Sequence, residues 1–252
     1  KGISWGGSLI RPEATGYGVV YFTQRMLEHH GYGFEGKKVV ISGSGNVAQY
    51  AAEKVIQLGG KVLTLSDSSG YIYDKDGINK EKLAYLMELK NKLRARINRY
   101  LEKYPKAQFF PNKRPWEVKC DIALPCATQN ELNLNDAKAL VSNGCIAVSE
   151  GANMPCTSDA INHFQSSNVL YAPGKASNAG GVATSGLEMS QNSLRINWTR
   201  EEVDQRLKEI MFNIHSSCVE FGRAGKTVDY VKGANIAGFV KVADAMIDQG
   251  IV

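Results

Sequence analysis

The chain has 252 residues, of which 43% are hydrophobic and 22% are charged, as is typical of globular proteins. This length is enough to bury the core of one large domain or of two small ones. Its net charge of +5 is too mild to indicate a nucleic-acid partner, and no run of about eighteen apolar residues predicts a membrane span.

Strand-like and helical patterns alternate through the first two thirds of the chain. Short apolar runs predict strands at 38–42, 61–66, 120–125, 145–150 and 168–173. Apolar residues at helical spacing predict helices at 46–58, 79–104, 135–142 and 157–166. Residues 70–77 are expected to form a small excursion with an Asp-Gly turn. This alternation predicts an α/β fold with a doubly wound, mostly parallel, Rossmann-like sheet.

Helical segments at both chain ends are expected to flank that sheet. The first is predicted at 15–30. Thr199 and Glu202 form a capping-box pattern that opens a helix ending at Gly222, and a last helix is predicted at 234–248. Residues 1–252 are therefore interpreted as one cofactor-binding domain, made of a cleft segment and helix (1–35), a Rossmann-like core (36–175) and C-terminal helices (176–252).

A glycine-rich turn after the first strand predicts a dinucleotide site. Its residues are Gly43, Ser44, Gly45, Asn46, Val47 and Ala48. Gly43 permits the tight turn, Gly45 lets a pyrophosphate approach the backbone, and the following helix offers free N–H groups. Alanine replaces the third glycine, where close packing is needed. Asp67 follows 24 residues after Gly43, at the end of the next strand, near the expected spacing of about 20.

The residues around Asp67 leave the choice between NAD and NADP open. A carboxylate there normally accepts a hydrogen bond from the ribose 2′-OH and disfavours a 2′-phosphate. Ser66 and Ser68 are small donors that could bind a phosphate, and the basic run 90–103 could bring cations to the same place.

The cysteines and histidines do not predict a metal site. The five cysteines form no C-x-x-C pair, and the four histidines lack ligand spacing. An odd number of cysteines favours free thiols in a reducing compartment, so a cytoplasmic location is expected. The opening residues KGISWGGSLIRPE lack the apolar run of a signal peptide.

Six motifs along the whole chain resemble the small hexameric glutamate dehydrogenases, in particular their NADP-dependent members. They are SLIRPEATGYG (8–18), GSGNVA (43–48), DIALPCATQNEL (121–132), EGANMP (150–155), APGKASNAGGVATSGLEMSQN (172–192) and GANIAGFVKVADAM (233–246). The resemblance implies interconversion of L-glutamate with 2-oxoglutarate and ammonia, by hydride transfer to a nicotinamide.

The resemblance also assigns residues to the cleft. It implies that four residues line the substrate side: Arg11, Thr15, Val182 and Ser185. It places Thr15, Ala127, Thr128, Asn153 and Asn178 beside the nicotinamide and its ribose. The alternatives are structural: Thr15 as a helix N-cap, Ser185 on a helix surface, and the two asparagines bonding to backbone.

In NADP-dependent members, the stretch containing Asp67 and Ser68 surrounds the 2′-phosphate, and cations of the following helix contribute. Lys90 and Arg96 are the positions carried over, with Arg94 and Arg99 as competitors because a spacing of six does not favour one helix face. NADP is therefore expected over NAD.

The family's catalytic lysines and aspartate lie in an N-terminal domain whose motifs are absent from this sequence. No catalytic residue is predicted here, and Lys175 is not promoted to that role.

The resemblance further implies a homo-hexamer for a complete enzyme. Two alternatives stay open: a related leucine, phenylalanine or valine type of dehydrogenase, and a non-catalytic nucleotide-binding module. Ser185 distinguishes the first alternative, because a polar contact for a second carboxylate favours glutamate.

Overall fold

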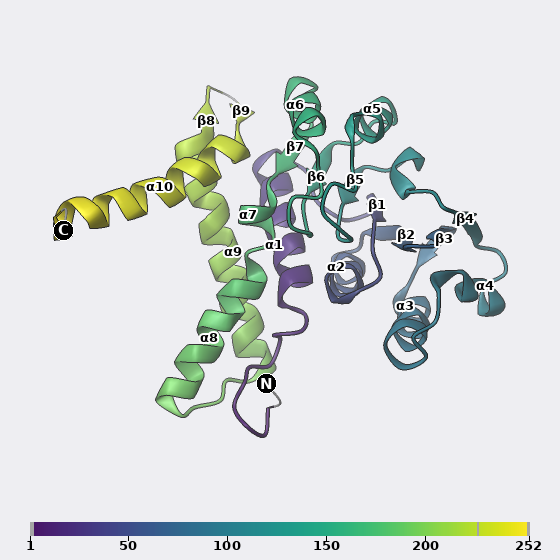
Figure 1. Ribbon diagram of the computed structural model, residues 1–252, viewed down its shortest axis with the longest axis horizontal. Helices are drawn as coiled ribbons and strands as arrows, with labels where there is room; N and C mark the ends of the chain where they lie inside the picture. Colours follow the sequence, from purple (N-terminus) through teal and green to yellow (C-terminus); the bar gives the residue numbers. More distant parts are fainter. Residues whose placement is uncertain (1–2, 226, 251–252) are drawn as a thin grey trace.

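The computed structural model describes residues 3–225 and 227–250, so the outermost residues of the predicted 1–252 range lie outside it. A seven-stranded sheet forms the centre, in the order β4-β3-β2-β1-β5-β6-β7 (Figure 1). Its strands are β1 (Lys38–Ile41), β2 (Lys61–Asp67), β3 (Gly70–Ile78), β4 (Gln108–Pro111), β5 (Ile122–Leu124), β6 (Ala147–Ser149) and β7 (Leu170–Ala172). The pairs β1–β2, β1–β5, β5–β6 and β6–β7 are parallel, which confirms the predicted mostly parallel α/β sheet.

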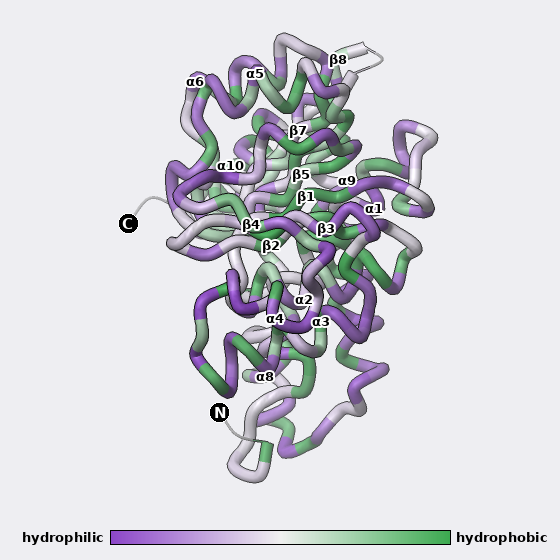
Figure 2. Tube along the Cα trace, turned by 90° about the vertical axis from the view of Figure 1, so that its right-hand side faces the viewer, coloured by the Kyte–Doolittle hydropathy of each residue, from purple (hydrophilic) through white to green (hydrophobic). Residues whose placement is uncertain are grey.

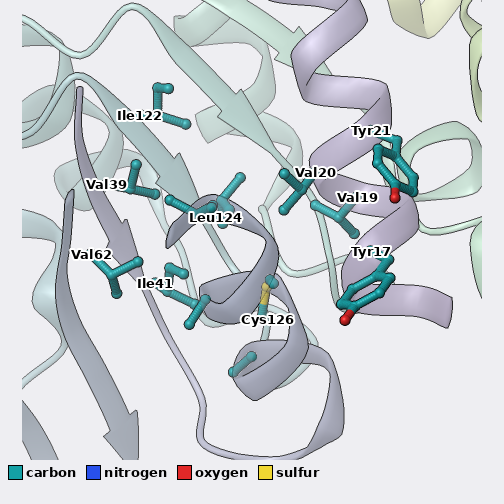
Figure 3. Packing of buried hydrophobic residues seen from close by; sticks show 14 of the residues in the cluster. Tyr17, Val19, Val20, Tyr21, Val39, Ile41, Val62, Ile122, Leu124 and Cys126 are labelled. Atoms are coloured by element: carbon teal, nitrogen blue, oxygen red, sulfur yellow. The ribbon is translucent and has the colours of Figure 1, made fainter. Parts of the chain in front are cut away.

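Helices cover both faces of the sheet. Those within the α/β unit are α2 (Asn46–Gln57), α3 (Lys80–Met87), α4 (Tyr100–Lys103), α5 (Leu134–Ser142) and α6 (Ser158–Ser166), and the short α7 (Gly174–Ser177) follows β7. Alternate strand residues enter different cores: Val39 and Ile41 pack with α1, whereas Val40 packs with Trp116 and α5. Figure 3 shows the first of these cores, with Val19 of α1 among its members. Strands buried on both faces explain the continuous apolar runs in the sequence.

Helices from both chain ends pack beside the sheet. They are α1 (Ala14–His29), α8 (Gly180–Leu194), α9 (Arg200–Gly222) and α10 (Tyr230–Gln249), with a small hairpin of β8 (Arg223–Ala224) and β9 (Thr227–Val228) between the last two. The predicted capping box is present, since Glu202 N donates to Thr199 Oγ1 and Thr199 N donates to Glu202 Oε2. α10 projects from the body (Figure 1).

Two expectations for residues 70–104 are wrong. The stretch 70–77 is not a turn-containing excursion; it belongs to β3, which pairs antiparallel with β2 and with β4. The β4 strand was not predicted at all. Stacking of Tyr71 on Phe110, with ring centroids 4.8 Å apart, supports this added pair.

The predicted single helix 79–104 is also wrong. α3 ends at Met87 and continues as a π-helical turn (Glu88–Lys92) and, after a break, a 3₁₀ turn (Ile97–Arg99) before α4. Arg94 adopts a φ of 51° in that break. Leu89 and Ile97 are fully buried while Leu93 is 56% exposed. Tertiary packing therefore overrides the helical spacing of these apolar residues.

The sheet has one point at which strand order reverses. The chain moves outward from β1 to β4 and then returns to β5 on the other side of β1. In open α/β sheets, ligands bind outside the carboxyl ends of the strands at such a point. In Figure 2, green segments lie around β1 and β5 at the centre of the sheet, and the surface helices mix purple and green.

Candidate functional site

A pocket of about 660 Å³ lies beyond the carboxyl ends of β1, β5 and β6. Nine of its lining residues are predicted site residues: Arg11, Thr15, Val47, Ala127, Thr128, Asn153, Asn178, Val182 and Ser185. The remaining lining residues are Cys126, Gln129, Gly151, Ala152 and Gly181. A second pocket, of about 640 Å³, lies beside β7 and the start of α10 and contains no predicted residue.

The two glycines of the turn after β1 have different surroundings. Gly43 has a φ of +85°, and a Cβ there would lie 2.8 Å from Cys126 O. Its N–H donates to Ser66 Oγ at 2.7 Å. Gly45, at the start of α2, has a φ of −84°, and a Cβ there would meet open space. Gly43 is therefore needed for the turn itself, whereas Gly45 leaves room for a ligand at the helix N-terminus.

A buried carboxylate fastens the neighbouring loop after β5. Glu131 Oε1 accepts hydrogen bonds from Ala127 N at 2.9 Å, Thr128 N at 3.3 Å and Ser42 Oγ at 2.9 Å. Burial raises the pKa of the Glu131 carboxyl, and these donors oppose that effect. Sequence reasoning missed Glu131, because an acid in a polar loop carries no signal of burial.

The segment just before α1 meets α8 at the other side of the pocket. Arg11 Nε donates to Ser185 Oγ at 2.9 Å, and Ser185 Oγ donates to Gly181 O at 3.1 Å. Thr15 is not the N-cap of α1, since that position is occupied by Glu13. Val182 is 72% exposed. Ser185 is thus half-buried and tied to a cation, rather than lying free on a helix surface.

The two asparagines of the pocket bond to each other. Asn178 Nδ2 donates to Asn153 Oδ1 at 2.8 Å and to Ala152 O at 3.3 Å. Glu150 supports this corner, as its Oε2 accepts from Gly174 N at 2.7 Å. Lys175 reaches away from the pocket, because its Nζ donates to Asn235 Oδ1 at 2.7 Å.

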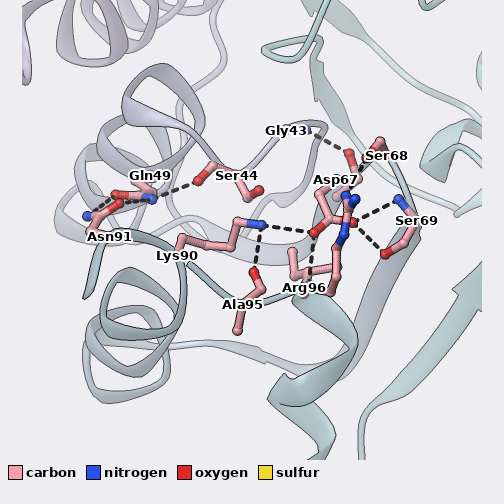
Figure 4. Close-up of polar contacts among 12 residues, drawn as sticks. Gly43, Ser44, Gln49, Asp67, Ser68, Ser69, Lys90, Asn91, Ala95 and Arg96 are labelled. Carbon is pink, nitrogen blue, oxygen red and sulfur yellow. Dashed lines mark hydrogen bonds and ion pairs between the residues drawn. The ribbon is translucent and has the colours of Figure 1, made fainter. Parts of the chain in front are cut away.

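Asp67, at the end of β2, has both oxygens occupied by protein donors (Figure 4). Its Oδ1 accepts from the N–H and hydroxyl of Ser69, at 2.9 and 2.6 Å. Its Oδ2 accepts from Lys90 Nζ and Ile97 N, both at 2.9 Å. Burial alone would raise the pKa of Asp67, but these hydrogen bonds lower it to about 2.

The break in the predicted helix brings Lys90 to Asp67 and Arg96 to Ser68. Lys90 Nζ also donates to Ala95 O at 3.0 Å. Arg96 Nη1 donates to Ser68 Oγ, and Arg96 is exposed. The competitor Arg99 instead pairs with Glu102 on the surface. A spacing of six places Lys90 and Arg96 together because the chain between them is not α-helical.

Known relatives match the chain over its whole length. It is 63% identical to a glutamate dehydrogenase of Bacteroides thetaiotaomicron, 62% to an NAD(P)-specific glutamate dehydrogenase of Xylanibacter ruminicola and 58% to an NADP-specific one of Escherichia coli. The chain is covered completely in each case, yet it spans only 57%, 56% and 56% of these relatives.

A solved structure shows the same fold. The glutamate dehydrogenase of Plasmodium falciparum superimposes with a TM-score of 0.96 at 52% identity, over 100% of this chain and 54% of that one. The model of the family described as glutamate/leucine/phenylalanine/valine dehydrogenase matches residues 6–250. The chain therefore belongs to the glutamate/leucine/phenylalanine/valine dehydrogenase family.

Proposed function

We propose that this chain is the NADP(H)-binding domain of a glutamate dehydrogenase, with the cleft segment, core and C-terminal helices divided as expected from the sequence. The observation that carries the proposal is the meeting of nine predicted residues in one pocket, beside a glycine turn at a helix N-terminus. The names of the relatives add support, since they are glutamate dehydrogenases.

In this proposal, the dinucleotide lies across the carboxyl edge of the sheet. Gly43, Ser44, Gly45, Asn46 and Val47 hold the pyrophosphate through backbone N–H groups at the start of α2. The loop with Ala127 and Thr128 lies beside the ribose, and Asn153 and Asn178 face the nicotinamide. The nicotinamide, when bound, accepts or supplies the hydride, and the chain's residues orient it.

Charge around Asp67 favours NADP over NAD. Asp67 contributes one negative charge, which Lys90 balances at 2.9 Å, and Arg96 adds a further positive charge beside Ser68. A 2′-phosphate carries nearly two negative charges. It could accept hydrogen bonds from the exposed Arg96 and from Ser68. A ribose 2′-OH would find the oxygens of Asp67 already engaged.

For the substrate, we propose L-glutamate and 2-oxoglutarate, with Arg11, Thr15, Val182 and Ser185 lining their side of the cleft. The hydroxyl of Ser185 and the guanidinium of Arg11 form a polar, cationic pair, which suits a second carboxylate. A leucine, phenylalanine or valine type of substrate would instead place an apolar side chain against these polar groups.

We assign no residue of this chain a role in acid–base catalysis. In the proposal, the catalytic lysines and aspartate come from the part of the longer relatives that this chain does not cover. The homo-hexamer and the cytoplasmic location remain predictions. No helix in the described part of the chain is long and apolar enough to cross a membrane.

Calorimetric titration of the chain with NADPH and NADH tests the proposal. We expect binding of both, with NADPH tighter, and no oxidation of glutamate by the chain alone. Adding the uncovered N-terminal part of a relative is expected to give glutamate-dependent reduction of NADP⁺. Absence of nucleotide binding would contradict the proposal, and binding without activity after such addition would favour a non-catalytic module.

A further inference from the structure

Gln49 and Asn91 form a reciprocal amide pair between α2 and the π-helical turn. Gln49 Nε2 donates to Asn91 Oδ1 at 3.0 Å, and Asn91 Nδ2 donates to Gln49 Oε1 at 2.9 Å (Figure 4). Gln49 is 1% exposed. Its Nε2 also donates to Ser44 O at 2.7 Å, so one side chain contacts both the glycine turn and the turn that carries Lys90.

Through Gln49, the pair joins segment 88–97 to the glycine turn, while other anchors of this segment lie at the end of β2. Lys90 and Ile97 bind Asp67, and Arg96 binds Ser68. Asn91 is the anchor on the side of Ser44. When NADP binds, its pyrophosphate would lie at the glycine turn and its 2′-phosphate at the end of β2. The distance between these two places depends on the anchors of the segment.

We infer that the Gln49–Asn91 pair is a specificity-positioning device, which fixes the distance between the pyrophosphate-binding turn and the cations that receive a 2′-phosphate. This inference rests on the proposed NADP-binding function. Asn91 acts through the position of Lys90 and Arg96 and touches neither phosphate. Removing Asn91 therefore weakens the binding of NADPH more than that of NADH.

The test measures the ratio of the dissociation constants for NADH and NADPH in the unchanged chain and in Asn91→Ala. Asn91 is exposed and its two bonds to Gln49 are partly buried. A typical intramolecular hydrogen bond corresponds to about fivefold in an equilibrium constant, so we expect the ratio to fall by about fivefold. Gln49→Met removes the amide at both contacts and is expected to lower the ratio and the affinity for both nucleotides. The matched control is Asn98→Ala, an exposed asparagine of the same region, which should leave the ratio unchanged.

A swapped pair separates positioning from simple stability. In Gln49→Asn with Asn91→Gln, the summed length of the two side chains is kept, and we expect the ratio to recover toward its original value. If Asn91→Ala does not fold, the swapped pair is measured in its place. A ratio close to that of the unchanged chain supports the inference, and a folded swapped pair without preference for NADPH overturns it. A ratio that survives Asn91→Ala in a folded chain overturns the inference alone. An unchanged chain that does not prefer NADPH overturns the cofactor assignment and the inference with it.

Discussion

Lys90 Nζ lies 2.9 Å from Asp67 Oδ2, and the two side chains are only 19% and 8% exposed. The carboxylate at the end of β2 is thus a buried anchor for the segment after α3. In a dinucleotide fold, the same position normally offers its oxygens to a ribose. Here those oxygens accept hydrogen bonds from protein groups instead. One of these donors, Lys90, is a cation that we propose to lie beside a phosphate.

Asp67→Asn tests whether this carboxylate serves structure or ribose. The variant loses the charge that Lys90 and Ile97 N–H bind, so we expect a loss of about 1–3 kcal/mol in the free energy of unfolding at pH 7. We do not expect NADH affinity to fall more than NADPH affinity. Urea unfolding and calorimetric titration measure the two quantities, and a selective loss of NADH binding would show that Asp67 binds ribose after all.

Arg96→Ala should separate phosphate recognition from stability. Arg96 is exposed and binds Ser68, so its loss should leave the free energy of unfolding nearly unchanged. A charge-assisted hydrogen bond to phosphate contributes about 1.5–3 kcal/mol, and NADPH should therefore bind at least tenfold more weakly, with NADH unaffected. Added salt should weaken NADPH binding more than NADH binding.

Two companion variants sharpen that experiment. Arg99→Ala removes an equal charge that pairs with Glu102 on the surface, and it should alter neither affinity. Lys90→Ala leaves buried Asp67 without its counter-charge, so it should lower both NADPH affinity and stability. Equal loss of both nucleotides in the Lys90 and Arg96 double variant would mean that this segment is only structural.

Gly43→Ala and Gly45→Val should have opposite effects. At Gly43 the φ of +85° and the approach of Cys126 O to 2.8 Å oppose any Cβ, so about 1–3 kcal/mol of stability should be lost. At Gly45 a branched side chain enters open space; it should cost at most about 1 kcal/mol as a poorer N-cap and abolish nucleotide binding. Thermal unfolding with calorimetry checks both, and unchanged affinity in Gly45→Val would remove the turn from the site.

Acid should destabilise the chain through His215. Burial and the nearby charges of His29, Arg25 and His30 lower the pKa of His215 from 6.5 to about 3, and its Nε2 lies 3.2 Å from Tyr230 Oη. Between these two pKa values the unfolded chain binds the proton that the folded chain refuses. Stability should therefore be full above pH 6.5 and fall on acidification by up to about 1.4 kcal/mol per pH unit.

His215→Gln removes this proton while keeping a group that can bond to Tyr230. The slope of unfolding free energy between about pH 6 and pH 4 should become shallower in this variant. Asp67 does not affect this slope. Its pKa is lowered from 3.8 to about 2, so its contribution to stability is lost only on acidification below about pH 4. An identical slope in the variant and the unchanged chain would mean that His215 does not contribute.

Local patterns were sufficient for most of the sheet and for the glycine turn. Residues such as Val39 and Ile41 lie in short apolar runs, and the strands that they predict are present. The segment 79–104 was mispredicted because Leu93 fits the helical spacing yet lies on the surface at 56% exposure. Its course is set by Asp67, a residue distant in sequence, and local spacing cannot report such a contact.

The site shows the same division. Motifs carried by the family resemblance located the pocket residues, such as Arg11 and Ser185. The supporting residues Glu131, Gln49 and Asn91 were missed. Glu131 and Gln49 are buried and Asn91 is exposed, but each has a hydrogen-bond partner elsewhere in the chain, and such a partner cannot be read from a single sequence.

The antiparallel pair β3–β4 closes the excursion between β2 and β5 on itself. Gly70 pairs with Pro111, and Asn112 N donates to Ser69 O at 2.9 Å. The two ends of the excursion therefore meet beside Asp67, while Lys90 and Arg96 lie inside it. In the proposed function, the cations that select the cofactor therefore lie on a segment whose two ends adjoin, while Asp67 and Ser68, which bind them, lie just before it. Grafting this segment, together with Asp67, Ser68 and Gln49, into an NAD-dependent relative should transfer the preference as one unit.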